Sequence, residues 1–206
     1  MKLDYWFASL LIRGIAKLFL GLKVIGRENI PTRGRLIIAA NHQSYLDPPI
    51  IGSCIPREIF YMAKAELFSK PVLGKLIRRW NSIPVKRSGR DFASLKAATG
   101  VLEREGALLV FPEGTRSRTG EFLQPTGGLG FLAAISGADI LPIFISGTRG
   151  AWKRILRRSG IKVIIGKPIH LDLENVELST AKQKYQAMSN RVMQAIAELK
   201  TSAAGL

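Results

Sequence analysis

The sequence predicts a single α/β domain in which a mixed, mostly parallel sheet is flanked by helices and preceded by an N-terminal amphipathic helical segment. Short apolar runs typical of buried strands alternate along the chain with longer helix-like segments, the order expected for such a sheet. The 206 residues are 47% hydrophobic, which is enough for one sizeable core. We therefore divide the chain into a helical segment, residues 1–24, and a domain, residues 25–206.

The N-terminal segment is apolar but too interrupted to span a membrane. Residues 3–22 are rich in Leu, Ile, Phe and Trp, yet Asp4, Arg13 and Lys17 divide them into runs shorter than the ~18 apolar residues of a spanning helix. Ser9, Arg13 and Lys17 recur at every fourth position and form one polar stripe. This pattern predicts a helix that lies in a membrane interface. The alternative is an ordinary amphipathic helix packed on the domain.

The remaining elements follow in alternation. Strands are expected at 35–40, 59–62, 83–86, 108–111, 140–145 and 163–165. Helices are expected from residue 48, at 66–79, at 91–105, after 127–128 and at 178–200. The glycine cluster at 126–130 could bind a phosphate at a helix start, but close helix packing is the favoured reading.

The segment 41–47, NHQSYLD, lies at the first strand-to-helix corner. Asp47 precedes two prolines and has the form of a helix N-cap. If the loop folds back, the Asp47 carboxylate can accept a hydrogen bond from one imidazole nitrogen of His42 and leave the other free to take a proton. That is the base and orienting acid of acyl-transfer catalysis. The alternatives are a polar loop histidine beside a capping aspartate or, less favoured, a hydrolase that uses Ser44.

A second polar segment, FPEGTRS at 111–117, ends another buried strand. It places an acid, a hydroxyl and a guanidinium at the carboxyl end of a strand, where open α/β sheets hold ligands. Between the two segments, the apolar run at 83–85 ends in Lys86 and Arg87. Because the planar guanidinium matches a phosphate with two parallel hydrogen bonds, Arg87 and Arg116 could clamp one.

These segments resemble the glycerolipid acyltransferases. NHQSYLD, Arg87, FPEGTRS and the LPI at 141–143 stand in the order and approximate spacing of the four sequence blocks of that family, and the likeness extends over about residues 20–170. It implies the glycerolipid acyltransferase fold, with His42 as general base and Asp47 as its partner. It also implies a glycerol phosphate pocket formed by Arg87, Glu113, Gly114, Thr115 and Arg116.

The likeness is greatest to the lysophosphatidic acid acyltransferases. It implies transfer of a fatty acyl group from acyl-CoA or acyl-carrier protein to the free hydroxyl of lysophosphatidic acid, giving phosphatidic acid for phospholipid biosynthesis, without a cofactor or metal. The chain departs from the family at Asn81 and Ser82, where glycine is frequent, and at 124–127, QPTG, where lysine is frequent. Another acceptor, a lyso-ornithine lipid or glycerol 3-phosphate, therefore stays open. A non-enzymatic basic module that binds membrane or nucleic acid is the alternative from another class.

Charge indicates an anionic partner. Lys plus Arg number 31 against 15 Asp plus Glu, a net charge of +16. Much of the excess lies in two stretches, each of which includes a tryptophan: Lys70, Lys75, Arg78, Arg79, Trp80, Lys86, Arg87 and Arg90, then Arg149, Trp152, Lys153, Arg154, Arg157, Arg158, Lys162 and Lys167. Tryptophan beside cations suits an anionic membrane surface. No nucleic acid is expected, because no zinc finger, helix-turn-helix or RNP motif is visible.

The single cysteine and the second histidine give information on the compartment and on metal binding. Cys54 is the single cysteine, so no internal disulfide can form and a reducing compartment is favoured. It lies in an apolar stretch and is expected to be a buried structural thiol. His170 is expected in a surface turn, and no Cys/His cluster has metal-ligand spacing. Together these features predict a peripheral membrane enzyme on the cytoplasmic face.

Overall fold

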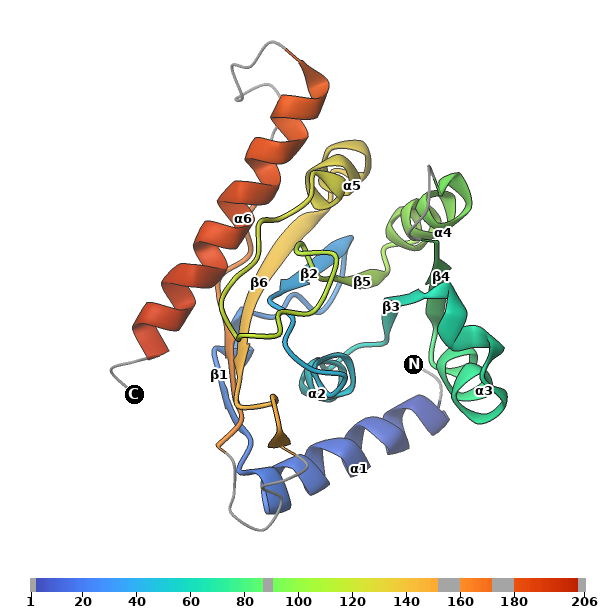
Figure 1. Cartoon of the computed structure of the whole chain (residues 1–206), viewed down its shortest axis with the longest axis vertical. Coiled ribbons are helices and arrows are strands. Elements are labelled where there is room, and N and C mark those ends of the chain that lie inside the picture. Colours follow the sequence, from blue (N-terminus) through green and yellow to red (C-terminus); the bar gives the residue numbers. More distant parts are fainter. Residues whose placement is uncertain (1–2, 87–90, 152–159, 172–179, 204–206) are drawn as a thin grey trace.

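The computed structural model describes residues 3–86, 91–151, 160–171 and 180–203. In these residues a seven-stranded sheet has the order β1-β7-β6-β2-β5-β3-β4, and only β6 and β7 pair antiparallel (Figure 1). The strands are β1 (Lys23–Ile25), β2 (Leu36–Ala40), β3 (Ile59–Lys64), β4 (Ser82–Val85), β5 (Ala107–Val110), β6 (Asp139–Ser146) and β7 (Lys162–Ile165). The predicted mixed, mostly parallel sheet is confirmed.

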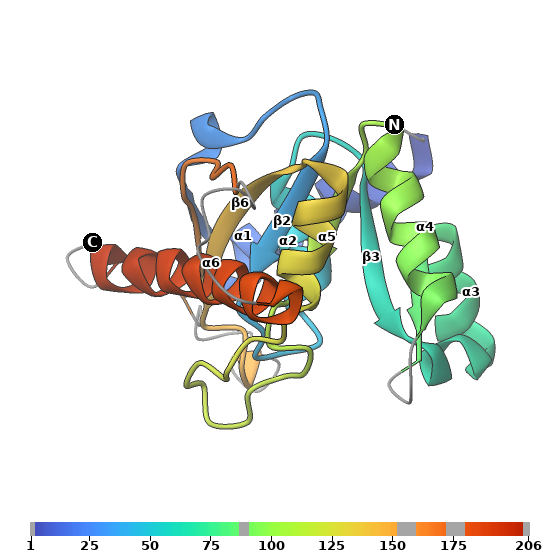
Figure 2. The same ribbon diagram turned by 90° about the horizontal axis from the view of Figure 1, so that it is seen from above.

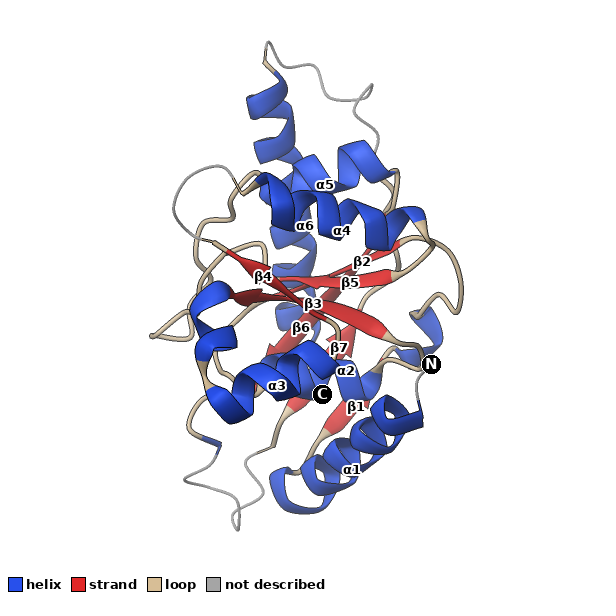
Figure 3. Ribbon diagram, turned by 90° about the vertical axis from the view of Figure 1, so that its right-hand side faces the viewer, coloured by secondary structure: helices blue, strands red, loops and turns tan. Residues whose placement is uncertain are grey.

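Helices cover both faces of the sheet. They are α1 (Leu3–Leu20), α2 (Asp47–Cys54), α3 (Pro71–Arg79), α4 (Phe92–Glu103), α5 (Gly128–Ser136) and α6 (Ala181–Ala203), with short 3-10 turns η1 (Arg27–Asn29) and η2 (Ala65–Ser69). Figure 3 shows α1, α2 and α3 on one face and α4, α5 and α6 on the other. Two hydrophobic clusters, one on each face, form the core.

Strand β2 explains why an unbroken apolar run precedes the first polar segment. Leu36, Ile38 and Ala40 pack toward α1 and α2, whereas Ile37 and Ala39 pack toward α4, α5 and α6. All five residues are buried, since helices cover both faces of the strand. β2 lies between β5 and β6, so its carboxyl end opens at the centre of the sheet edge.

Two details differ from the predicted elements, whereas the favoured reading of the glycine cluster is confirmed. The helix expected at 66–79 is divided into η2 and α3, because Pro71 has no N–H to continue a helix and is favoured in the first turn of a new one. Strand β1 was not predicted, and it pairs with β7, so the sheet begins at Lys23, before the expected boundary. The glycine cluster serves close packing, since a Cβ on Gly130 would lie 2.1 Å from the carbonyl oxygen of Tyr185 in α6. Figure 2 shows α5 meeting the N-terminal part of α6 there.

Helix α1 packs on the domain and also exposes an apolar face. Tyr5, Ala16 and Leu20 are buried in the core cluster below the sheet. The opposite side of the helix is apolar as well, and Phe7 and Leu11 are among its exposed side chains. Among the described residues, no helix is both long and apolar enough to cross a membrane. One face of α1 thus packs into the core, and its outward face presents apolar side chains to the surroundings.

Candidate active site

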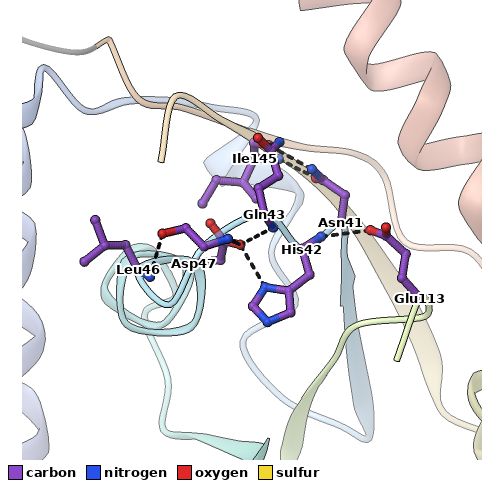
Figure 4. A network of polar contacts seen from close by, with 8 residues as sticks. Asn41, His42, Gln43, Leu46, Asp47, Glu113 and Ile145 are labelled. Carbon is purple, nitrogen blue, oxygen red and sulfur yellow. Dashed lines mark hydrogen bonds and ion pairs between the residues drawn. The ribbon is translucent and has the colours of Figure 1, made fainter. Parts of the chain in front are cut away.

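His42 and Asp47 form a hydrogen-bonded pair at the carboxyl end of β2. Their contact joins His42 Nδ1 to Asp47 Oδ2 over 2.8 Å (Figure 4). An ionised carboxylate can only accept hydrogen bonds, so this contact places the imidazole proton on Nδ1 and leaves Nε2 as the basic nitrogen. The His42 side chain is 15% exposed and that of Asp47 is fully buried. The pair therefore has the geometry of a base held by an orienting acid, as the spacing predicted.

Asp47 holds the loop 41–47 closed, in addition to orienting the imidazole of His42. Its Oδ2 also accepts hydrogen bonds from the main-chain N–H groups of Gln43, at 2.6 Å, and Ser44, at 2.7 Å. The prediction that Asp47 is the N-cap of the next helix is wrong. Leu46 occupies that position and Asp47 is the first helical residue, with its side chain turned back toward the loop rather than onto the helix. The loop contacts all use Oδ2, and among the described residues the buried Oδ1 has no hydrogen-bond partner.

Asn41 and Gln43 fasten the same loop to β6. The Asn41 side chain donates to the carbonyl oxygen of Ile145 at 2.9 Å and accepts from the Ile145 N–H at 2.8 Å. Gln43 Nε2 donates to the same carbonyl at 2.8 Å (Figure 4). Neither role was predicted from the sequence. The available signal was an amide residue directly after a buried apolar strand, where it can extend the strand pairing with its side chain.

The second polar segment meets the first because β5 neighbours β2. Ala39 pairs with Val110, so the residues that follow each strand are also adjacent. The ring of Phe111 stacks on the imidazole of His42, with 3.9 Å between centroids and 15° between planes. The main-chain N–H of Ser117 donates to the His42 carbonyl oxygen at 2.8 Å. FPEGTRS and NHQSYLD are therefore brought together.

Glu113 lies beside His42, but the main chain engages its carboxylate. Oε1 accepts from the His42 N–H at 2.9 Å, and Oε2 accepts from the Leu123 N–H at 2.9 Å. Burial raises the pKa of this carboxyl, and the two hydrogen bonds partly offset that rise. Both oxygens tie loops together, so this geometry favours a positioning role over the predicted contact with glycerol phosphate.

The next three residues of this turn are open to solvent. Gly114 has a φ of +66°, a left-handed conformation that glycine adopts without strain, and Thr115 and Arg116 follow it on the exposed surface. The Arg116 guanidinium lies over the ring of Tyr45, 3.6 Å from its centroid. This contact was not predicted. Arg87 and Arg90 lie outside the described residues, as do residues 152–159 of the second basic stretch.

An apolar cavity of about 490 Å³ lies beside the ring of Phe111 that stacks on His42, between α1, α2, α3 and the sheet edge. Phe111 and Tyr45 form part of its wall, together with Pro48 from the first turn of α2. Tyr5 of α1 and Tyr61 of β3 also line it, with their hydroxyl oxygens 2.9 Å apart. Burial raises the pKa of both phenols. This cavity was not predicted from the sequence, because its walls come from distant segments.

The remaining reactive side chains lie away from the pair. Cys54 is buried, and burial raises its pKa to about 11, which confirms the expected structural thiol. His170 is exposed as expected, and its Nδ1 contacts Asp139 Oδ1 at 2.9 Å at the start of β6. In the described part of the chain, no group of three or more His, Cys, Asp or Glu residues could hold a metal ion.

The chain is similar to known acyltransferases along most of its length. A family model described as Acyltransferase matches residues 21–146. A 1-acyl-sn-glycerol-3-phosphate acyltransferase of Bacillus subtilis is 29% identical over 95% of this chain and 96% of its own length. One from Saccharomyces cerevisiae is 35% identical over 71% of this chain, which spans only 50% of that protein.

A solved structure agrees. The crystal structure of the 1-acyl-sn-glycerophosphate (LPA) acyltransferase PlsC from Thermotoga maritima superposes with a TM-score of 0.70 at 28% identity, over 96% of this chain and 78% of that one. Its fold is the mostly parallel sheet flanked by helices described above. The family model, the sequence relatives and the shared fold agree with the two polar segments that meet at His42, and the chain belongs to the acyltransferase family.

Proposed function

We propose that this enzyme transfers a fatty acyl group from an acyl thioester to the free hydroxyl of lysophosphatidic acid, giving phosphatidic acid for phospholipid biosynthesis. The observation on which the proposal rests is the His42–Asp47 pair, which is joined through Nδ1 and leaves Nε2 as the basic nitrogen, beside an apolar cavity. The related proteins named for the same activity, from bacteria to yeast, support it. The donor is acyl-CoA or acyl-carrier protein, and no further cofactor is invoked.

The chemistry follows from the basic nitrogen. His42 Nε2 takes the proton of the lipid hydroxyl while its oxygen attacks the thioester carbonyl. The new C–O bond forms, the C–S bond breaks, and the thiolate leaves with the proton returned by the imidazolium. Asp47 stabilises the imidazolium, and a base so positioned accelerates the reaction typically ~10²–10⁴-fold.

The phosphate of the acceptor and a fatty acyl chain bind at different places. Arg116 on the exposed turn, together with Arg87, binds the phosphate of the acceptor through paired charged hydrogen bonds. The apolar cavity holds a fatty acyl chain, because its wall consists mostly of hydrocarbon and aromatic side chains. Phe111 belongs to both places, since it stacks on His42 and lines the cavity.

We also place the enzyme at the cytoplasmic face of a membrane, bound through the exposed apolar side of α1. Trp6, Phe7 and Leu11 are exposed on that helix. The net charge of +16 favours an anionic surface. The single cysteine, buried and unpaired, suits a reducing compartment.

The test is an assay of purified protein in detergent with acyl-CoA and with acyl-carrier protein as donors. Acceptors are lysophosphatidic acid, a lyso-ornithine lipid, glycerol 3-phosphate and a monoacylglycerol that lacks the phosphate. We expect phosphatidic acid as the dominant product, and its formation by the His42→Ala protein should fall by about 10²–10⁴-fold. A preference for another acceptor, with lysophosphatidic acid left unused, would refute the assignment of the substrate.

A further inference from the structure

Exposed apolar side chains are concentrated on two helices of one face. Of 14 large hydrophobic residues exposed in the described part of the chain, eight lie on α1 and three on α3. The three on α3 are Val72, Leu73 and Leu76, exposed by 82%, 38% and 39%. On the helices of the opposite face, Phe92 and Ile135 are the only large hydrophobic residues that are exposed in the described part of the chain. Such an uneven distribution marks an interaction surface.

Helix α3 is oriented by its glycine. Gly74 packs against the main chain of η2, where a Cβ would lie 2.3 Å from the carbonyl oxygen of Phe68. This close contact keeps the Gly74 side of α3 packed against η2. Val72 and Leu76, four residues apart, then lie together on the outer side. The apolar stripe of α3 is therefore held outward by packing on its other side.

The two helices belong to one surface. Arg79 Nε of α3 forms an ion pair with Asp4 Oδ2 of α1 at 2.6 Å. Figures 1 and 3 place the N-terminal end of α1 beside α3, on the same side of the sheet. Leu73 and Leu76 are exposed and also line the cavity, so they form part of its rim. The opening toward the candidate active site thus lies within this apolar surface.

We propose that α3 is a second lipid-contacting element, and that the cavity rim at Leu73 and Leu76 faces the hydrocarbon of an anionic bilayer, so that a lipid chain enters the cavity sideways from the membrane. The proposal rests on the proposed function, in which the cavity holds an acyl chain. It extends the membrane contact from α1 to the entrance of the cavity.

Charge identifies the occupant as an anionic bilayer. Basic side chains lie near the stripe at Lys70 and Lys75, and their exposed ammonium groups are available to phosphate headgroups once Val72 is inserted below them. The acidic side chains nearby are already paired, Asp4 with Arg79 and Glu66 with Lys64. A continuous apolar strip with a cationic border is the pattern of a surface that lies in the membrane interface.

The direct test places an environment-sensitive fluorophore at Val72. Val72→Cys can be labelled selectively, because Cys54 is buried and its pKa is about 11. Leu10→Cys on α1 is the membrane-contacting reference, and Ile135→Cys on α5 is the matched control on the opposite face. With vesicles of phosphatidylglycerol and phosphatidylcholine, we expect the Val72 probe to shift to the blue and to be quenched by lipid-borne quenchers, like the Leu10 probe. The Ile135 probe should do neither.

A Val72 probe that behaves like the Ile135 probe would overturn the proposal. So would a probe that ignores vesicles but shifts as the protein concentration rises, since it would show that another copy covers α3. These readouts need no substrate, so their outcome is independent of the outcome of the acceptor assay. An enzyme that fails to acylate lysophosphatidic acid could still insert α3, and an active enzyme could fail to do so.

Activity gives a second readout. Val72 does not line the cavity, so Val72→Asp should leave turnover of detergent-dispersed acceptor unchanged. The ratio of vesicle-bound to free protein should fall about tenfold, as expected for removing one valine side chain from hydrocarbon. Turnover of vesicle-embedded acceptor should fall with it, whereas Ile135→Asp should change neither. Equal vesicle binding by Val72→Asp and the unsubstituted protein would contradict the proposal.

Discussion

The imidazole of His42 lies face to face with the ring of Phe111, with 3.9 Å between their centroids. The two residues are far apart in the chain and meet because β2 and β5 are neighbours in the sheet. Phe111 shields one face of the base from water, and Asp47 fixes its Nδ1 edge. Neither contact uses the Nε2 edge, so in the proposed reaction the hydroxyl approaches His42 along that edge.

We expect His42→Ala to lower acyl transfer by about 10²–10⁴-fold, because it removes the positioned base. Asp47→Asn should be severely impaired as well, since a neutral amide cannot stabilise the imidazolium and its NH₂ group cannot accept the loop hydrogen bonds. Initial rates with lysophosphatidic acid provide the measurement. His170→Ala is the matched control, because that histidine also contacts an aspartate but is exposed. Near-normal turnover by His42→Ala would show that the base lies elsewhere.

Arg116→Ala should raise the KM for a phosphate-bearing acceptor more than that for the acyl donor. Loss of a hydrogen bond to a charged group costs about 1.5–3 kcal/mol. Tyr45→Ala should cause a smaller rise, since a cation–π contact at an exposed site is worth about 0.5–1 kcal/mol, whereas Tyr45→Phe keeps the ring and should be neutral. Arg118→Ala controls for the loss of one positive charge from the same loop. Equal effects on an acceptor without phosphate would argue against the phosphate role. A loss in kcat alone would instead indicate that Arg116 stabilises the negative charge that develops on the thioester carbonyl oxygen.

Glu113→Gln should lower kcat and leave the KM for the acceptor nearly unchanged. The amide has one acceptor oxygen, so it can serve either His42 or Leu123 but not both. The turn that supports the base should loosen without any change at the phosphate. Glu121→Gln, at an exposed position of the same loop, is the control. A rise in acceptor KM at constant kcat would instead place Glu113 in the substrate pocket.

Ala8→Trp should shorten the preferred acyl chain, because position 8 lines the cavity and the indole would fill part of it. Competition among acyl-CoA substrates of increasing length measures the shift. Leu11→Trp introduces the same side chain on the exposed side of α1 and should leave the preference unchanged. If both substitutions leave chain preference unaltered, the acyl group does not occupy this cavity.

The paired phenols of Tyr5 and Tyr61 predict how stability depends on pH. Burial raises both pKa values above the usual 10.0, so the unfolded chain loses these protons at lower pH than the folded protein does. The stability due to the neutral phenols is fully present below pH 10 and is lost as pH rises from there through the folded-state pKa. Denaturant unfolding of the Tyr5→Phe/Tyr61→Phe protein should lack this part of the alkaline loss. An identical pH profile would contradict the assignment.

The two hydroxyls are not equivalent. The main chain of Ile59 and the side chain of Ser9 help to lower the pKa of Tyr5 against the effect of burial, whereas the contact with Tyr5 itself raises the pKa of Tyr61. Tyr5→Phe should therefore leave a buried hydroxyl unpaired, at a cost of about 1–3 kcal/mol in the free energy of unfolding. Tyr61→Phe should cost less. The reverse order would show that Tyr61 has the stronger second partner.

Local pattern in the sequence was enough to predict the sheet-and-helix order and the His42–Asp47 pair. A buried strand has an unbroken apolar run such as 36–40, and a base and acid five residues apart can meet within one loop. Both are short-range properties, and hydrophobic periodicity and turn chemistry report them directly. Helix α1 was predicted for the same reason.

Contacts between distant segments required the tertiary structure. Apolar periodicity shows that a residue is buried but not which strand pairs with which, so the stacking of Phe111 on His42 and the use of Glu113 by main-chain amides could not be foreseen. The same holds for α1, whose pattern was compatible with packing and with membrane contact, and which does pack through Tyr5 while it exposes Phe7. The sequence by itself determined the reactive groups and their local spacing. Strand pairing and helix packing, which bring together residues separated by most of the chain, decided the direction of the base and the position of the cavity.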